Sequence, residues 1–408
     1  MLRRSLIHQG PARASLRSLS ASDIVCLISL FWFASYADQY LFSVGGPPPL
    51  LGQLVCVTSI SAVVFYRAVL AVPVWRERSA RFKKFAIIMI VYALWTLICY
   101  MYSSQDEVVT ELLIARIKAV VLILLFAYVL DHERLAVPFA KGCAVLACAG
   151  ALLNVQDFVS PTFSTVPGRA AGLYLNPTIS GFMIIALGAV GIRSAPLAAR
   201  YVLWPAICVG VLLTFSRAAW LYVMISTIGL AWLGVFGFGR VRLLFSGSIC
   251  LVVGAFGYLF VTGQLADVIA LSPLGGYLDA NTLNRLGASG SIVGDFSSFE
   301  RESVVRLGME YFGEAPLIGQ GLGFTHEWRA AVSTHNMYIL WLAEGGIIGF
   351  TVYIALVLFL WNGALREQWV VAIIFLVAGV FTHNLLDAAG EGVVIAFLGA
   401  SAGRRVLK

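Results

Sequence analysis

Long apolar runs recur along almost the whole chain and are separated mostly by short polar connections. Twelve runs of roughly 15–20 residues approach the length that a helix needs to cross about 30 Å of hydrocarbon. They lie near 22–38, 49–66, 85–103, 112–130, 138–154, 178–192, 201–215, 219–236, 243–262, 344–362, 369–386 and 391–403. The pattern predicts an all-α polytopic membrane protein with about twelve transmembrane helices, forming one membrane domain over residues 1–408.

Two connections are longer than the others, 155–177 and 263–335. In the second, Ser297-x-x-Glu300 fits a helix capping box, so a helix is predicted to begin near Ser297. Pro316 and the glycines that follow it are expected to end that helix. The segment 263–335 is therefore predicted to be a long, partly helical loop before the tenth span, and loops of this length are usually functional.

Composition and charge agree with this class. Apolar residues make up 60% of the chain and charged residues 12%, with a mean hydropathy of +0.88, which excludes an ordinary soluble domain. The net charge of +7 does not require a nucleic-acid partner, because most cations fall on alternate connections. By the positive-inside rule these connections and both termini are cytoplasmic, and the 263–335 loop lies outside. The cytoplasmic set comprises Arg3, Arg4, Arg13, Arg17, Arg76 to Lys84, Arg134, Lys141, Arg193, Arg200, Arg240, Arg242, Arg366, Arg404, Arg405 and Lys408.

A few arginines oppose this bias and need another explanation. Arg169 precedes a span by a few residues, and Arg217 occupies a connection so short that its guanidinium must lie at the membrane surface. Guanidinium groups bind phosphate oxygens bidentately and keep their charge. We interpret both as binding a lipid-linked phosphate or pyrophosphate. For Arg285, Arg306 and Arg329 the alternative is favoured, namely snorkelling or pairing with loop carboxylates.

The segment Thr334-His335-Asn336 closes the long loop where the chain re-enters the membrane. An imidazole titrates near pH 6.5 and can accept a proton from a hydroxyl at neutral pH, so His335 is a candidate general base. A helix-capping or core role for His335 is the alternative. His383 is interpreted as a hydrogen-bonding residue between helices. No external cluster of carboxylates fits a Mg²⁺ site, so neither a metal nor another cofactor is expected.

The spacing of His335-Asn336, nine further residues and then Gly346-Ile347-Ile348-Gly349 resembles the signature of bacterial O-antigen ligases. Three further segments resemble the wider superfamily of O-antigen ligases and polymerases. They are Gly168-Arg169 through Asn176-Pro177, the Ser216-Arg217 turn, and Arg301 leading to Gly323. One position departs from the family pattern, since Val305 stands where an aromatic residue is frequent, and this weakens the assignment of Arg301.

The resemblance implies a GT-C-like, metal-independent, inverting glycosyltransferase of the bacterial inner membrane with a periplasmic active site. Its donor would be an O-antigen glycan on undecaprenyl pyrophosphate, transferred en bloc to a sugar hydroxyl of lipid A-core. His335 would act as the general base or position the acceptor, while Arg169, Arg217 and Arg301 would bind the pyrophosphate. Supporting roles are expected for Asn176, Asn336, Gly346 and Gly349. The two glycines would let another helix approach closely.

Two other functions remain open. An O-antigen polymerase would share the topology and the arginines but would use a second lipid-linked glycan as acceptor. A transporter for the lipid-linked glycan would place ionisable residues inside spans, as Glu111, Arg116 and Lys118 do in the fourth run.

Overall fold

The computed structural model describes residues 19–70, 78–166, 168–237, 239–272, 275–276, 296–327, 334–361 and 366–400. All regular structure in these segments is helical, as the apolar pattern predicts. The α-helices are α1 (Ala21–Ala34), α2 (Ala37–Ser43), α3 (Pro49–Leu70), α4 (Ala80–Met101), α5 (Glu107–Leu130), α6 (Glu133–Val159), α7 (Pro177–Gly191), α8 (Leu197–Leu212), α9 (Arg217–Trp232), α10 (Arg240–Val261), α11 (Leu265–Ala270), α13 (Phe296–Glu314), α14 (Phe324–Glu327), α15 (Met337–Trp361), α16 (Arg366–Phe381) and α17 (Ala389–Gly399). Short 3₁₀ helices cover Gly172–Tyr174 and Ile192–Ser194.

The helices include several that can cross a bilayer. Within the described segments, six helices are long and apolar enough, and a seventh results if the bent pair α1 and α2, at 55° to each other, forms one span. Four further apolar helices are shorter, at Leu51–Phe65, Leu197–Leu212, Gln368–Phe381 and Ala389–Gly399. The protein is therefore an integral membrane protein. The count of twelve spans and the single-domain organisation remain predictions.

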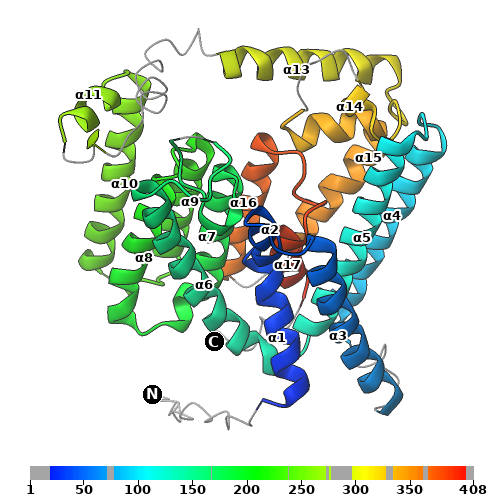
Figure 1. The fold of residues 1–408 in the computed structure, drawn as a ribbon, viewed down its shortest axis with the longest axis horizontal. Helices are drawn as coiled ribbons and strands as arrows, with labels where there is room; N and C mark the ends of the chain where they lie inside the picture. Colours follow the sequence, from blue (N-terminus) through cyan, green and yellow to red (C-terminus); the bar gives the residue numbers. More distant parts are fainter. Residues whose placement is uncertain are drawn as a thin grey trace, which may run out of the picture.

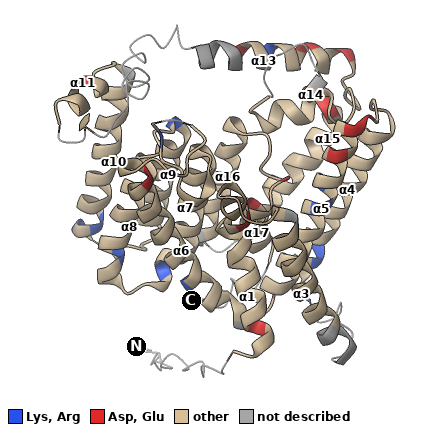
Figure 2. Ribbon diagram, in the orientation of Figure 1, with Lys and Arg blue, Asp and Glu red and all other residues tan. Residues whose placement is uncertain are grey.

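The upright helices form a bundle, and α13 lies across one end of it (Figure 1). On one side α6 packs against α7 and α8, and α9 packs against α10. On the other, α5 packs against α4 and α17, and α15 packs against α4. Helix α16 contacts α7, α9 and α15, so it joins the two groups. Acidic residues concentrate on α13 to α15, whereas several cations lie at the opposite end of the bundle, including the start of α10 (Figure 2).

The seven cysteines are free thiols on the helices. The helix predicted in the long loop is present as α13 and ends at Glu314, before Pro316, but it begins at Phe296, so the serine and glutamate of the expected capping box lie inside the helix.

Helix α15 is broken at Gly346, whose backbone has φ 60° and ψ −161°. The chain that follows α13 passes through the break and bonds to both sides of it. Ile347 N donates to Pro316 O at 2.9 Å, and Gln320 N donates to Ala343 O at 2.8 Å. Backbone groups left unpaired by a broken helix are costly away from water, so this segment stabilises the break.

The Gly346-x-x-Gly349 pair serves two different close approaches. A Cβ on Gly346 would lie 2.5 Å from the carbonyl carbon of Leu317, which belongs to the inserted segment. A Cβ on Gly349 would lie 2.7 Å from Nε1 of Trp95 on α4. Gly349 thus admits a neighbouring helix, as the spacing suggests, whereas Gly346 admits a loop.

We expect Gly346→Ala to destabilise the protein, because alanine disfavours this backbone conformation and its methyl group would meet Leu317. Strain in such a conformation alone costs about 1–3 kcal/mol. The melting temperature of the purified protein measures the effect. Gly254→Ala on α10 is the matched control, since no atom lies within 4 Å of its Cβ position. Equal melting temperatures for the two variants would contradict the account of the break.

A buried ionic cluster lies beside the break. Arg116 on α5 donates through Nη2 to Glu344 Oε2 at 3.0 Å, and its Nε lies 3.5 Å from Asp387 Oδ1. Thr325 on α14 donates to the other oxygen of Glu344 at 2.7 Å. The side chains of Arg116 and Glu344 are 2% and 1% exposed, so their charges are almost fully removed from solvent. The cluster connects α5, α14, α15 and the segment before α17.

Candidate active site

His335 lines a cavity of about 200 Å³ at the junction of the two helix groups. Its walls come from the start of α7, from α9, and from the chain that runs from the end of α16 to the start of α17. They include Asn176, Thr178, Tyr222, His383 and Glu391. Two residues singled out from the sequence, His335 and Asn176, therefore reach the same space although they are far apart in the chain.

The local sequence holds His335 in an uncommon conformation. Its φ of 43° is in the left-handed region, which costs a residue other than glycine some strain. Asn336, the next residue, caps α15, because its Oδ1 accepts hydrogen bonds from Tyr338 N at 2.9 Å and Ile339 N at 3.2 Å. The cap fixes where the helix begins, and the left-handed residue before it carries an exposed imidazole to the cavity.

Asn176 does the same for α7. Its Oδ1 accepts from Thr178 N at 2.9 Å and from Ile179 N at 3.3 Å, so it caps the helix that Pro177 begins. The Asn-Pro pair thus has a structural role in addition to its position at the cavity.

Arg169 is positioned by a buried carboxylate. Asp157, which is 2% exposed, accepts hydrogen bonds from four backbone N–H groups of the loop after α6. The loop so ordered carries Arg169, whose Nε donates to Thr214 O at 2.9 Å. Because Thr214 lies three residues before Arg217, the structure brings the two predicted phosphate-binding segments together.

Arg217 is the first residue of α9 and is exposed. Its guanidinium carbon lies 5.1 Å from the centre of the Phe260 ring. Neither Arg169 nor Arg217 lines the His335 cavity. Arg217 is on the same helix, α9, as the cavity residue Tyr222. The ring centre of Tyr222 is 6.2 Å from that of Phe182, a cavity residue on α7.

The third predicted arginine, Arg301, lies on α13, which crosses the end of the bundle (Figure 1). Its side chain lies outside the described part of the structure, as do Arg285 and Arg329.

The structure adds residues that the sequence interpretation missed. The ring centres of His335 and His383 are 5.3 Å apart in an edge-to-face arrangement, so His383 belongs to the cavity and not only to helix packing. Burial, together with the nearby His335, His326 and Arg116, lowers the pKa of His383 to about 4, so this imidazole is neutral at pH 7. The tripeptide Thr-His-Asn occurs twice, at 334–336 and 382–384, and this repetition was the available signal.

Glu391 was also missed. It is 1% exposed and accepts a hydrogen bond from the hydroxyl of Tyr36 on the turn between α1 and α2.

Among the described residues, no group of three or more His, Cys, Asp or Glu side chains is arranged to hold a metal ion.

Comparison with protein families bears on this arrangement directly. Residues 201–354 match the family model described as O-antigen ligase. The matched segment belongs to the O-antigen ligase superfamily. It includes Arg217, Arg301, His335, Gly346 and Gly349, so the resemblance inferred from the motif spacing is confirmed. No curated protein matches the chain.

The superfamily consists of glycosyltransferase-like membrane enzymes that build O-antigen, and it includes both ligases and polymerases. The cavity takes His335 and Tyr222 from the matched segment. Asn176, His383 and Glu391 come from outside it. The cavity is therefore completed by residues that come before and after the matched segment in the sequence.

Proposed function

We propose that this protein is an O-antigen ligase. It transfers the glycan en bloc from undecaprenyl pyrophosphate to a sugar hydroxyl of lipid A-core during lipopolysaccharide synthesis. The observation that carries the proposal is the placement of His335 in a cavity whose walls on α7 and α9 begin at the Arg169 and Arg217 segments. Glycosyl transfer needs a proton acceptor and a cationic site for the leaving group. His335 would provide the first, and Arg169 and Arg217 would provide the second, in one region of the protein.

The reaction balances with these groups. The acceptor oxygen attacks the anomeric carbon, the bond from that carbon to the pyrophosphate oxygen breaks, and the hydroxyl proton moves to His335. Attack from the face opposite the leaving group inverts the configuration. Undecaprenyl pyrophosphate leaves with the bonding electrons, and Arg169 and Arg217 stabilise the charge it gains. The N-terminus of α9, where Arg217 lies, is the positive end of the helix dipole and also favours the negative charge of the leaving group.

Positioning is the larger contribution, because pyrophosphate is already a good leaving group. On this mechanism the arginines take the place that a metal ion has in other glycosyl transfers. Arg301 is proposed to assist from α13.

The site is proposed to face the periplasm, with both termini in the cytoplasm. The distribution of cations in Figure 2 supports this orientation, since cytoplasmic ends of membrane helices collect Lys and Arg. The donor glycan is displayed at that face of the inner membrane.

Purified protein in nanodiscs, supplied with glycan on undecaprenyl pyrophosphate and with lipid A-core, tests the proposal. We expect transfer to lipid A-core, and we expect it to persist in EDTA. Glycan extended on the lipid carrier, with no transfer to the core, would instead identify a polymerase. Deletion of the gene gives the matching result in cells, where a ligase predicts full-length glycan accumulating on the carrier and a bare core.

The transporter alternative has less support. Arg116 is held in an ionic cluster with Glu344 and Asp387, which accounts for its charge inside a span. Broken helices occur in transporters, but the break in α15 is paired with the backbone of the inserted segment. Deletion of a transporter would leave the lipid-linked glycan on the cytoplasmic leaflet. In the deletion cells described above, the leaflet on which the glycan accumulates therefore separates a transporter from a ligase.

A further inference from the structure

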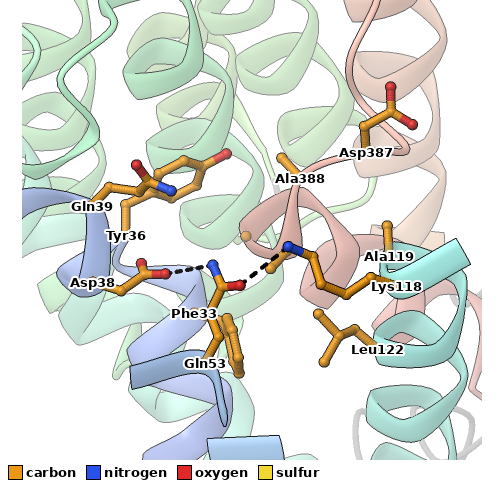
Figure 3. Close-up of a pocket in the computed structure, with 12 residues that line it drawn as sticks. Phe33, Tyr36, Asp38, Gln39, Gln53, Lys118, Ala119, Leu122, Asp387 and Ala388 are labelled. Carbon is orange, nitrogen blue, oxygen red and sulfur yellow. Dashed lines mark hydrogen bonds between the residues drawn. The ribbon is translucent and has the colours of Figure 1, made fainter. Parts of the chain in front are cut away.

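A second cavity of about 200 Å³ lies on the other side of the segment that joins α16 to α17. Its walls come from α2, the start of α3, α5 and residues 387–390 (Figure 3). Asp38, Gln53 and Lys118 line it and form a chain of hydrogen bonds. Gln53 donates to Asp38 Oδ2 at 2.9 Å, and Lys118 Nζ donates to Gln53 Oε1 at 3.4 Å. We call it the Lys118 cavity.

The position of Lys118 argues for a function. It lies within a candidate membrane span, Glu107–Leu130, and its side chain is exposed. Ionisable residues within membrane spans are rare, and they face polar cavities that serve substrates or ions. Figure 3 shows the ammonium group directed into the cavity toward Gln53, with Tyr36 and Gln39 across from it.

The charges at the cavity indicate the class of ligand. Lys118 is balanced by Asp38, and Asp387 already pairs with Arg116, so the walls have no excess of positive charge for a phosphate. Carboxylate, amide and ammonium groups instead offer acceptors and donors in alternation. Sugar hydroxyls, which both donate and accept, match such a set. The volume is below the roughly 300–1,000 Å³ of pockets for drug-sized ligands, so it suits a single sugar residue.

The two cavities share one wall. Tyr36 lines the Lys118 cavity, and its hydroxyl bonds to Glu391, which lines the His335 cavity. The arginine segments lie on the opposite side, at α7 and α9. A donor whose pyrophosphate binds Arg169 and Arg217 would therefore approach His335 from α7 and α9. The acceptor would approach from the side of the Lys118 cavity.

We propose that the Lys118 cavity binds one sugar residue of the acceptor glycolipid, next to the residue that is glycosylated. The proposal rests on the function given above. Gln53, Lys118 and Asp38 hold the sugar through its hydroxyls, and Phe33 and Tyr36 provide apolar faces beside it.

Lys118→Met and Gln53→Leu test it, since each removes hydrogen bonding while keeping most of the side-chain volume. We expect the KM for lipid A-core to rise about tenfold or more, with kcat and the KM for the lipid-linked donor unchanged. Lys141→Met is the matched control, because Lys141 is an exposed lysine on α6 that lines neither cavity. It should leave all three constants unchanged.

Two results would overturn the assignment. An increase confined to the donor KM would place the donor glycan in this cavity, and unchanged constants in both variants would exclude a sugar site there. In either case wild-type transfer to lipid A-core would still stand, whereas its absence would refute the ligase function itself. If Lys118→Met does not fold, as judged by its melting temperature, the Gln53→Leu constants decide.

Discussion

His335→Ala is expected to lower kcat for glycan transfer about 10²–10⁴-fold, the usual contribution of a positioned general base. Binding of the lipid-linked donor should change little, because the imidazole lies in the cavity and the arginines lie beside it. The measurement is a steady-state assay with lipid A-core varied at saturating donor. Arg217→Ala provides the contrast, since loss of a cation should raise the donor KM.

The control for this prediction is His132→Ala, since His132 lies between α5 and α6 and lines neither cavity. His383→Ala tests the neighbouring imidazole separately. Full activity of His335→Ala would refute its assignment as the base. If His383→Ala alone abolished transfer, the two histidines would exchange roles.

Glu344→Gln is expected to destabilise the protein by about 3–5 kcal/mol, because it leaves Arg116 buried with a weaker set of partners. The cost arises from removing one member of a desolvated pair. Arg116→Met together with Glu344→Met should therefore cost less than the sum of the two single changes. Thermal unfolding of Glu344→Gln, of the two single methionine variants and of the double variant in the same lipid nanodiscs measures this.

Glu111→Gln on α5 is the matched control, since Glu111 is exposed and its replacement should leave the melting temperature near that of the wild type. Additive effects of the two methionine substitutions would show that Arg116 and Glu344 act independently, contrary to the geometry.

The amino-acid pattern predicted much of this protein. The helical class follows from the apolar runs, and the end of α13 at Glu314 follows from Pro316. The motif spacing predicted the family that the match at residues 201–354 confirms. These features depend on residues that are close in the sequence, where periodicity and turn chemistry act directly.

The remaining features depend on contacts between distant segments. Arg116 on α5 and Glu344 on α15 are paired although they are 228 residues apart in the chain, and periodicity within α5 identifies neither the partner nor the depth of burial. His383 was interpreted from its own helix, but its position at the cavity is set by the packing of α16 against α7 and α9. The Lys118 cavity likewise depends on the bend between α1 and α2.

The segment between α16 and α17 has a consequence for the order in which the protein matures. Together with the start of α17, it supplies a wall to both cavities, through His383 and Glu391 at one cavity and Asp387 to Gly390 at the other. The break in α15 uses contacts within residues 316–347 and can form while later helices are still being synthesised. Neither cavity can form until the residues between 381 and 391 that line it have been synthesised. A nascent chain would thus carry its histidine and arginines in the membrane with no enclosed site until residues 381–391 have been inserted.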